Sequence, residues 1–241
     1  MLHEVTTGVP HHVAFIPDGN RRFARSKNSS LLEGYRQGYA KIEEVLTWCG
    51  ELRIPVVTVW VLSLDNLARP ADEVAALLAF IEEQIPVMVE LQHRAQVPRQ
   101  LRCLGRFDTF QPGLRTAIAA AEKDTREFGP FRLNLALAYG GQHEIVDAVK
   151  RVLEAARPGE SAAAIASRLT EHDIRQQLYG DDPDPDLIIR TSGELRLGGF
   201  MLWKSVYSEL FFCDALWPDL RREDFSAAIE AYQTRDRRRG T

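Results

Sequence analysis

Short apolar segments alternate with amphipathic helical patterns along almost the whole chain. Three stripes have helical spacing, one over 42–52, one over 74–89 and one over 145–153. Six apolar runs read as strands: 13–16, 56–62, 101–104, 131–138, 187–189 and 210–212. Strands that are apolar on both faces and separated by helices predict an α/β fold, with a mostly parallel six-stranded sheet flanked by helices.

The pattern predicts one domain spanning 1–241. No segment resembles a linker, and no internal repeat occurs at a period typical of repeat proteins. Hydrophobic residues make up 45% of the 241 residues, which is enough to pack one large core. We expect 1–11 to be an N-terminal extension and 222–241 to form a C-terminal helix and tail.

Charge and cysteine content exclude several classes of protein. With 30 Lys and Arg against 34 Asp and Glu, the net charge is −4, which does not favour nucleic-acid binding. Cys49, Cys103 and Cys213 are far apart and form neither a disulfide framework nor a zinc motif. The longest apolar runs are too short to span a bilayer, and 1–10 lacks signal-peptide features. We therefore expect a soluble, cytoplasmic protein.

The segment 16–24, IPDGNRRFA, follows the first predicted strand, where ligands bind in open parallel sheets. Gly19 permits close approach, Asn20 offers an amide, and Arg21 and Arg22 can grip phosphate oxygens. Asp18 would repel phosphate unless a hard cation such as Mg²⁺ lies between them. The segment predicts a site for a magnesium diphosphate. The alternative is an ordinary turn followed by solvated arginines.

Two further polar clusters follow other predicted strands, and Glu209 comes soon after the second. Each contains a short acid or hydroxyl together with an arginine, and capping of the helix that starts near Ala71 is the alternative for the first. Three clusters at the carboxyl ends of three strands predict two anionic pockets and a metal site. These clusters are Ser63, Asp65, Asn66 and Arg69 in one segment, and Arg190 and Arg196 in the other.

Five motifs together resemble one known family. IPDGNRRFA, SLDNLARP, YGG, RTSGELRL and WKSVYSELFF occur in the order and spacing of the cis-prenyltransferases, the undecaprenyl diphosphate synthase family. The resemblance covers about 12–240 and is strongest to actinobacterial short-chain members that make Z,E-farnesyl diphosphate. It implies a fold with an apolar tunnel between helices and sheet. It also implies an Mg²⁺-dependent condensation of isopentenyl diphosphate with geranyl or dimethylallyl diphosphate, releasing diphosphate.

The resemblance also implies a role for individual residues. Asp18 and Asn66 would be catalytic, Asp18 and Glu209 would bind Mg²⁺, and Val61 would limit chain length. The substrates would be bound by Gly19, Asn20, Arg21, Arg22, Phe23, Tyr35, Ser63, Asp65, Leu67, Arg69, Arg190, Arg196, Leu197, Gly198, Arg238 and Gly240. No residue is an obvious strong base, so the proton acceptor stays unassigned.

Several of these positions depart from the commonest family pattern. Tyr35 stands where many members have histidine, Phe23 where tryptophan is usual, and Gly198 where serine donates to phosphate. Val61 is bulkier than the alanine of many long-chain members and favours a short product.

The resemblance implies a homodimer in which the tail motif Arg238-Arg239-Gly240 reaches the partner's active site. We expect no nucleic-acid partner and at most peripheral membrane contact. Two alternatives remain open: a medium- or long-chain synthase, and a non-catalytic lipid-binding subunit of a prenyltransferase complex. A trans-type prenyltransferase is disfavoured, because 181–185 lacks DDxxD spacing and its prolines break helices. A P-loop kinase is disfavoured because GxxxxGK[ST] is absent.

Overall fold

A computed structural model describes residues 8–235 and contains one six-stranded sheet. The strand order is β3-β4-β2-β1-β5-β6, and every pairing is parallel, which confirms the predicted sheet. The strands are β1 (His12–Ile16), β2 (Val56–Trp60), β3 (Gln100–Leu104), β4 (Arg132–Ala136), β5 (Leu187–Arg190) and β6 (Glu209–Phe212).

Helices connect the strands, and short 3-10 turns follow β2 and β6. The three predicted amphipathic stripes lie on α2, α3 and α5. The helices are α1 (Asn20–Ser26), α2 (Leu31–Glu51), α3 (Ala71–Arg94), α4 (Pro112–Asp124), α5 (Gly141–Glu154), α6 (Ala162–Arg168), α7 (Glu171–Gln176) and α8 (Arg222–Thr234), and the turns are η1 (Leu64–Ala68) and η2 (Trp217–Asp219).

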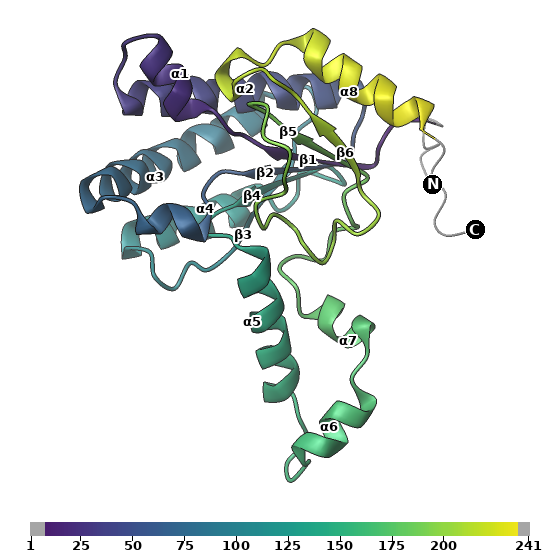
Figure 1. Cartoon of the computed structure of the whole chain (residues 1–241). Helices are drawn as coiled ribbons and strands as arrows, with labels where there is room; N and C mark the ends of the chain where they lie inside the picture. Colours follow the sequence, from purple (N-terminus) through teal and green to yellow (C-terminus); the bar gives the residue numbers. More distant parts are fainter. Residues whose placement is uncertain (1–7, 236–241) are drawn as a thin grey trace.

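One face of the sheet carries the large hydrophobic core. Side chains that alternate along the strands, such as Val13 and Phe15 of β1, point to this face and are fully buried. Helices α2, α3, α4 and α8 supply the opposing apolar residues (Figure 1). The aromatic rings of Phe15, Trp217 and Phe225 meet here with centroid separations of 5.8 and 6.3 Å. This face therefore holds α2 and α3 against the sheet.

The opposite face of the sheet is covered mainly by irregular segments. Its apolar side chains pack mainly against residues of the irregular segments that follow α7 and β5, including Tyr179, Phe200 and Met201. Helices α5, α6 and α7 instead project away from the sheet (Figure 1). The sequence pattern does not show which segments cover this face, because an irregular segment can bury aromatic residues without any helical periodicity.

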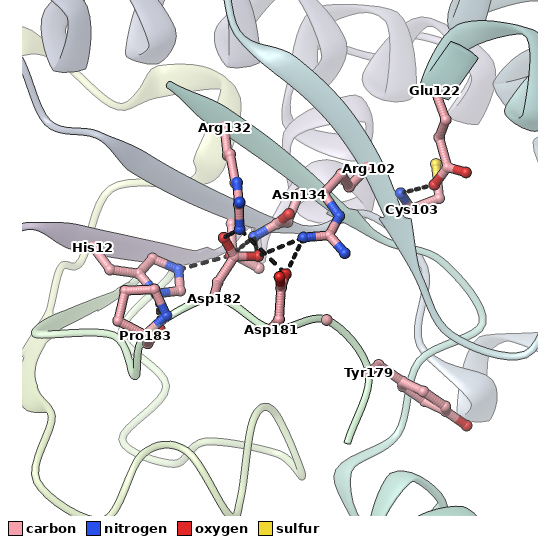
Figure 2. A network of polar contacts seen from close by, with 12 residues as sticks. His12, Arg102, Cys103, Glu122, Arg132, Asn134, Tyr179, Asp181, Asp182 and Pro183 are labelled. Atoms are coloured by element: carbon pink, nitrogen blue, oxygen red, sulfur yellow. Dashed lines mark hydrogen bonds and ion pairs between the residues drawn. The ribbon is translucent and has the colours of Figure 1, made fainter. Parts of the chain in front are cut away.

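A buried polar network also lies on this second face (Figure 2). His12 is fully buried and bonds the Pro183 carbonyl through Nδ1 at 2.7 Å and Thr58 Oγ1 through Nε2 at 2.8 Å. Asn134 Nδ2 donates to Thr58 Oγ1 and to Asp182 Oδ2, at 3.1 and 3.0 Å. The network fixes the segment after α7 onto the middle of the sheet.

The strand order places the polar motifs together. β1 lies between β2 and β5, and the strand order reverses at β1. At such a switch point a crevice forms beyond the carboxyl ends of the strands. The motif segments follow these three neighbouring strands. Within residues 8–235, no helix combines the length and hydrophobicity needed to cross a membrane.

Candidate functional site

The turn after β1 is held rigidly between two other segments. Gly19 has φ +108°, and a Cβ atom there would lie 2.9 Å from a Leu216 side-chain atom, so glycine is required. The backbone N–H of Asp18 donates to Thr191 Oγ1 at 2.9 Å, and its carbonyl accepts from Thr191 Oγ1 and from Trp217 N. These bonds fix the position of the Asp18 backbone, from which the carboxylate side chain extends.

The Asp18 carboxylate is paired directly with arginines. Arg190 Nη2 donates to Asp18 Oδ2 at 2.9 Å, and Arg22 Nη2 lies 3.6 Å from Oδ1. The Arg190 side chain is 7% exposed, and its buried Nε has no hydrogen-bond partner within residues 8–235. From the sequence, Asp18 is expected to bind a cation because its carboxylate would otherwise repel phosphate. The structure shows that neighbouring guanidinium groups also balance its charge.

The segment after β2 forms the opposite wall. Ser63 Oγ accepts from Asn66 N at 3.1 Å, and Asn66 Oδ1 accepts from Ser63 N at 3.3 Å. This capping box belongs to η1, whereas α3 begins after Pro70, so the alternative of a cap on the helix near Ala71 is wrong. Arg69 Nη1, at the end of η1, donates to Tyr35 Oη at 3.0 Å.

These walls enclose a polar cavity of about 560 Å³. Six arginines and two aspartates line it, giving the lining a formal charge of 6 − 2 = +4. Such a surplus in a concave site attracts an anion. The predicted site residues that line it are Asp18, Gly19, Asn20, Arg21, Arg22, Tyr35, Val61, Ser63, Asp65, Asn66, Arg69, Arg190, Arg196 and Gly198.

A narrow apolar cavity of about 80 Å³ adjoins the polar one, between α2, α3 and the sheet. Val61 and Tyr35 line both cavities, so Val61 stands at their junction and not at the deep end. Met88 is 1% exposed and also lines a third cavity of about 640 Å³ between the C-terminal halves of α2 and α3. Met88 therefore separates the apolar cavity from this third one.

Some predicted site residues lie elsewhere. Phe23, Leu67 and Leu197 do not line the polar cavity, and the last two pack against the hydrophobic cores. Arg238 and Gly240 fall outside the described residues.

Glu209 does not lie beside Asp18 within one chain. It pairs in register with Leu187, which is itself level with Val13, three residues before the end of β1. At about 3.3 Å per residue, Glu209 is roughly 10 Å back from the carboxyl ends of the strands. Its carboxylate pairs with Arg235 at 2.5 Å.

The donor set fits magnesium in one specific way. In the described part of the chain, no group of three or more His, Cys, Asp or Glu side chains could hold a metal ion. Mg²⁺ is commonly bound by one or two carboxylates together with substrate phosphates. Asp18, one-third exposed at the cavity wall, fits that mode as the single protein carboxylate.

Two acidic residues at the site, Glu73 and Glu194, were not predicted from the sequence. Glu73 contacts Arg21, Tyr35 and Arg69, and Glu194 lies 3.5 Å from Arg22 Nη2. Arg69 and Glu73 are four residues apart, and this spacing is the sequence signal that could have identified their ion pair.

Comparison with known proteins identifies the family. The family model for undecaprenyl diphosphate synthase matches residues 16–240. The chain is 47% identical to an isoprenyl transferase of Thermus thermophilus, covering 100% of this chain and 92% of that protein. It is 41% identical to isoprenyl transferase 1 of Streptomyces avermitilis, covering 96% and 89%.

Solved structures agree with these matches. The crystal structure of lavandulyl diphosphate synthase from Lavandula x intermedia in complex with dimethylallyl diphosphate superposes with a TM-score of 0.90 at 30% identity, covering 97% of this chain and 99% of that one. The family predicted from the five motifs and the parallel six-stranded α/β fold are confirmed. The chain therefore belongs to the undecaprenyl diphosphate synthase family of prenyltransferases.

Proposed function

We propose that this prenyltransferase condenses isopentenyl diphosphate with a short allylic diphosphate, geranyl or dimethylallyl, to give a short-chain Z-isoprenyl diphosphate and diphosphate. The observation that carries the proposal is the junction of the two cavities. An arginine-rich cavity suited to diphosphates opens onto a narrow apolar cavity that Met88 closes.

The residues divide by their place around the polar cavity. Arg21, Arg22 and the backbone at Gly19 lie on the wall nearest α1 and bind the allylic diphosphate. Arg190 and Arg196 lie on the wall after β5 and bind isopentenyl diphosphate. Guanidinium groups fixed in this way stabilise the charge that develops on a departing diphosphate.

Asp18 would hold Mg²⁺ against the diphosphate oxygens. When bound, the ion neutralises charge that builds up on the leaving group. Arg190 and Arg22 orient the Asp18 carboxylate toward the cavity. Glu209 could join this metal site only from outside its own protomer, since its own chain places it away from Asp18.

Asn66 positions the homoallylic substrate. The capping box occupies its Oδ1, and Nδ2 has no protein partner among the described residues, so this donor is available to the cavity. A neutral amide is a poor base. The proton that is lost from carbon as the new double bond forms is therefore passed to a diphosphate oxygen or to water.

Product length is tested by two substitutions. If Met88 closes the apolar cavity, Met88→Ala joins it to the third cavity and lengthens the product, whereas Val61→Ala widens only the junction. Met88→Leu, which keeps the volume, is the matched control and should leave the product unchanged. Mass spectrometry of the products checks this. An unchanged product from Met88→Ala combined with a longer one from Val61→Ala would place the limit at Val61.

A homodimer is supported by apolar surface on the projecting helix α5. Val146 and Leu153 are 50% and 49% exposed there. Light scattering at micromolar concentration should give twice the chain mass of 27.3 kDa. A monomer at that concentration would contradict the dimer.

The activity is tested by supplying purified protein with Mg²⁺, isopentenyl diphosphate and each of dimethylallyl, geranyl and farnesyl diphosphate. We expect a short Z-product from dimethylallyl or geranyl diphosphate, identified by chromatography against standards. Long polyprenyl products would instead support the medium- or long-chain alternative. No product from any primer would support the non-catalytic subunit.

A further inference from the structure

Glu73 lies behind the wall of the polar cavity. It occupies the first turn of α3, where the helix N-terminus stabilises a negative charge. Its side chain is 12% exposed and does not line the cavity, but three of its contact partners do: Arg21, Tyr35 and Arg69. Any influence of Glu73 on a ligand must therefore act through these partners.

One carboxylate holds three donors. Glu73 Oε1 accepts from the Tyr35 hydroxyl at 3.2 Å and from Arg69 Nη1 at 3.3 Å. The same Nη1 atom also donates to Tyr35 Oη at 3.0 Å, which closes a triangle of hydrogen bonds. Glu73 Oε2 lies 3.7 Å from Arg21 Nη2 and attracts it electrostatically.

The triangle leaves part of Arg69 available to a ligand. Both of its hydrogen bonds use Nη1, and in the described chain Nε and Nη2 have no protein partner. Arginine carries about 2 kcal/mol of side-chain rotamer entropy, so a guanidinium fixed before binding loses less on binding. Because Arg69 lines the polar cavity, its Nε and Nη2 remain free to donate to a ligand bound there.

A carboxylate close to an anion site has a cost as well. Its charge repels a diphosphate, so it weakens binding unless orienting the arginines contributes more. These two effects have opposite signs, and this makes the role of Glu73 measurable.

We propose that Glu73 is a positioning residue for the diphosphate of the allylic substrate. Tyr35, which it holds, lines both the polar and the apolar cavity. A substrate whose hydrocarbon tail enters the apolar cavity has its diphosphate at that junction. Arg190 and Arg196, across the cavity, do not contact Glu73. This inference rests on the proposed function and adds selectivity for one of its two substrates.

The test compares four proteins: the wild type, Glu73→Ala, Glu73→Gln and the control Asp72→Ala. Asp72 lies in the same turn, is exposed and makes no bond to the site. We expect Glu73→Ala to raise the KM for the allylic diphosphate about tenfold, with kcat and the KM for isopentenyl diphosphate changed less than twofold. Glu73→Gln keeps an oxygen acceptor and should stay within about threefold. Asp72→Ala should match the wild type.

Several outcomes would overturn the inference. A lower allylic KM in Glu73→Ala would show that the carboxylate only repels substrate. Equal increases in both KM values, or a fall in kcat alone, would show a general structural role. If Glu73→Ala fails to fold in a thermal melt, Glu73→Asp replaces it. This variant keeps the charge but is one methylene too short, and it should also raise the allylic KM selectively.

Calorimetry with inorganic diphosphate separates this inference from the proposed function. If no primer is turned over, the proposed function fails, yet Glu73 can still be tested by direct binding. We then expect Glu73→Ala to bind inorganic diphosphate about tenfold more weakly than Asp72→Ala does. Equal or tighter binding by Glu73→Ala would overturn the inference on its own.

Discussion

Two arginine–carboxylate clusters lie on the same sheet but differ in what they leave open. At the carboxyl ends of the strands, arginines outnumber aspartates around a cavity of about 560 Å³. On the second face, Arg102 and Arg132 are matched by Asp181 and Asp182, and Asp182 is only 3% exposed (Figure 2). Surplus positive charge facing a cavity suits a ligand, whereas balanced charge around a buried carboxylate fixes the fold.

The largest expected effect is the loss of activity when Asp18, in the cluster at the polar cavity, is replaced. Asp18→Asn keeps an oxygen acceptor for Arg190 but loses the negative charge that a cation needs. We expect turnover to fall more than a thousandfold, a change of about 4 kcal/mol or more in the activation free energy. The measurement is steady-state prenyl transfer with saturating substrates and Mg²⁺.

The control for Asp18 is stability. Because its side chain is one-third exposed, urea unfolding of Asp18→Asn should match the wild type closely. A variant that keeps its activity would show that residue 18 holds no essential cation. A variant that unfolds would mean that Asp18 belongs with the structural cluster.

The second expected effect is a loss of stability without a loss of activity when Asp182, in the second cluster, is replaced. Its Oδ1 accepts from the half-buried Arg132 at 2.7 Å, and its Oδ2 accepts from the buried Asn134 at 3.0 Å. Asp182→Ala removes a buried carboxylate from these donors, which keep only their second acceptors, Asp181 Oδ1 and Thr58 Oγ1. It should lower the free energy of unfolding by about 4 kcal/mol. Urea unfolding measures this, and activity per folded molecule should be unchanged. A stable variant with poor activity would reverse the comparison.

Sequence patterns predicted the first cluster better than the second. Three motifs that follow neighbouring strands meet because the carboxyl ends of parallel strands lie at the same edge of the sheet. The apolar runs in the sequence predict these strands. The pairing of Asp18 with Arg190 spans 172 residues and has no local signal. No role was assigned to Asp182, because nothing in its sequence context shows that it accepts a hydrogen bond from Asn134 of β4. Glu209 was assigned from its motif, and strand register then placed it away from Asp18.

The smallest of the three effects is the pH response of His12. The Pro183 carbonyl can only accept, so Nδ1 carries the proton and Nε2 accepts from the Thr58 hydroxyl. Burial lowers the pKa of His12 from 6.5 to about 4, and the nearby carboxylates of Asp182 and Asp186 only partly oppose this. The folded chain therefore keeps the ring neutral where the unfolded chain is already protonated.

The sign of the response follows from that difference. Above pH 6.5 both states are neutral at His12 and its contribution is fully present. Between pH 6.5 and about 4 only the unfolded state gains the proton, so stability falls with falling pH by about 3 kcal/mol over the window. His12→Gln removes this titration. Urea unfolding should therefore show the advantage of the wild type over His12→Gln shrinking by about that amount from pH 7 to pH 4. A constant difference would mean that the ring reaches solvent in the folded chain, and the second cluster would then be open like the first.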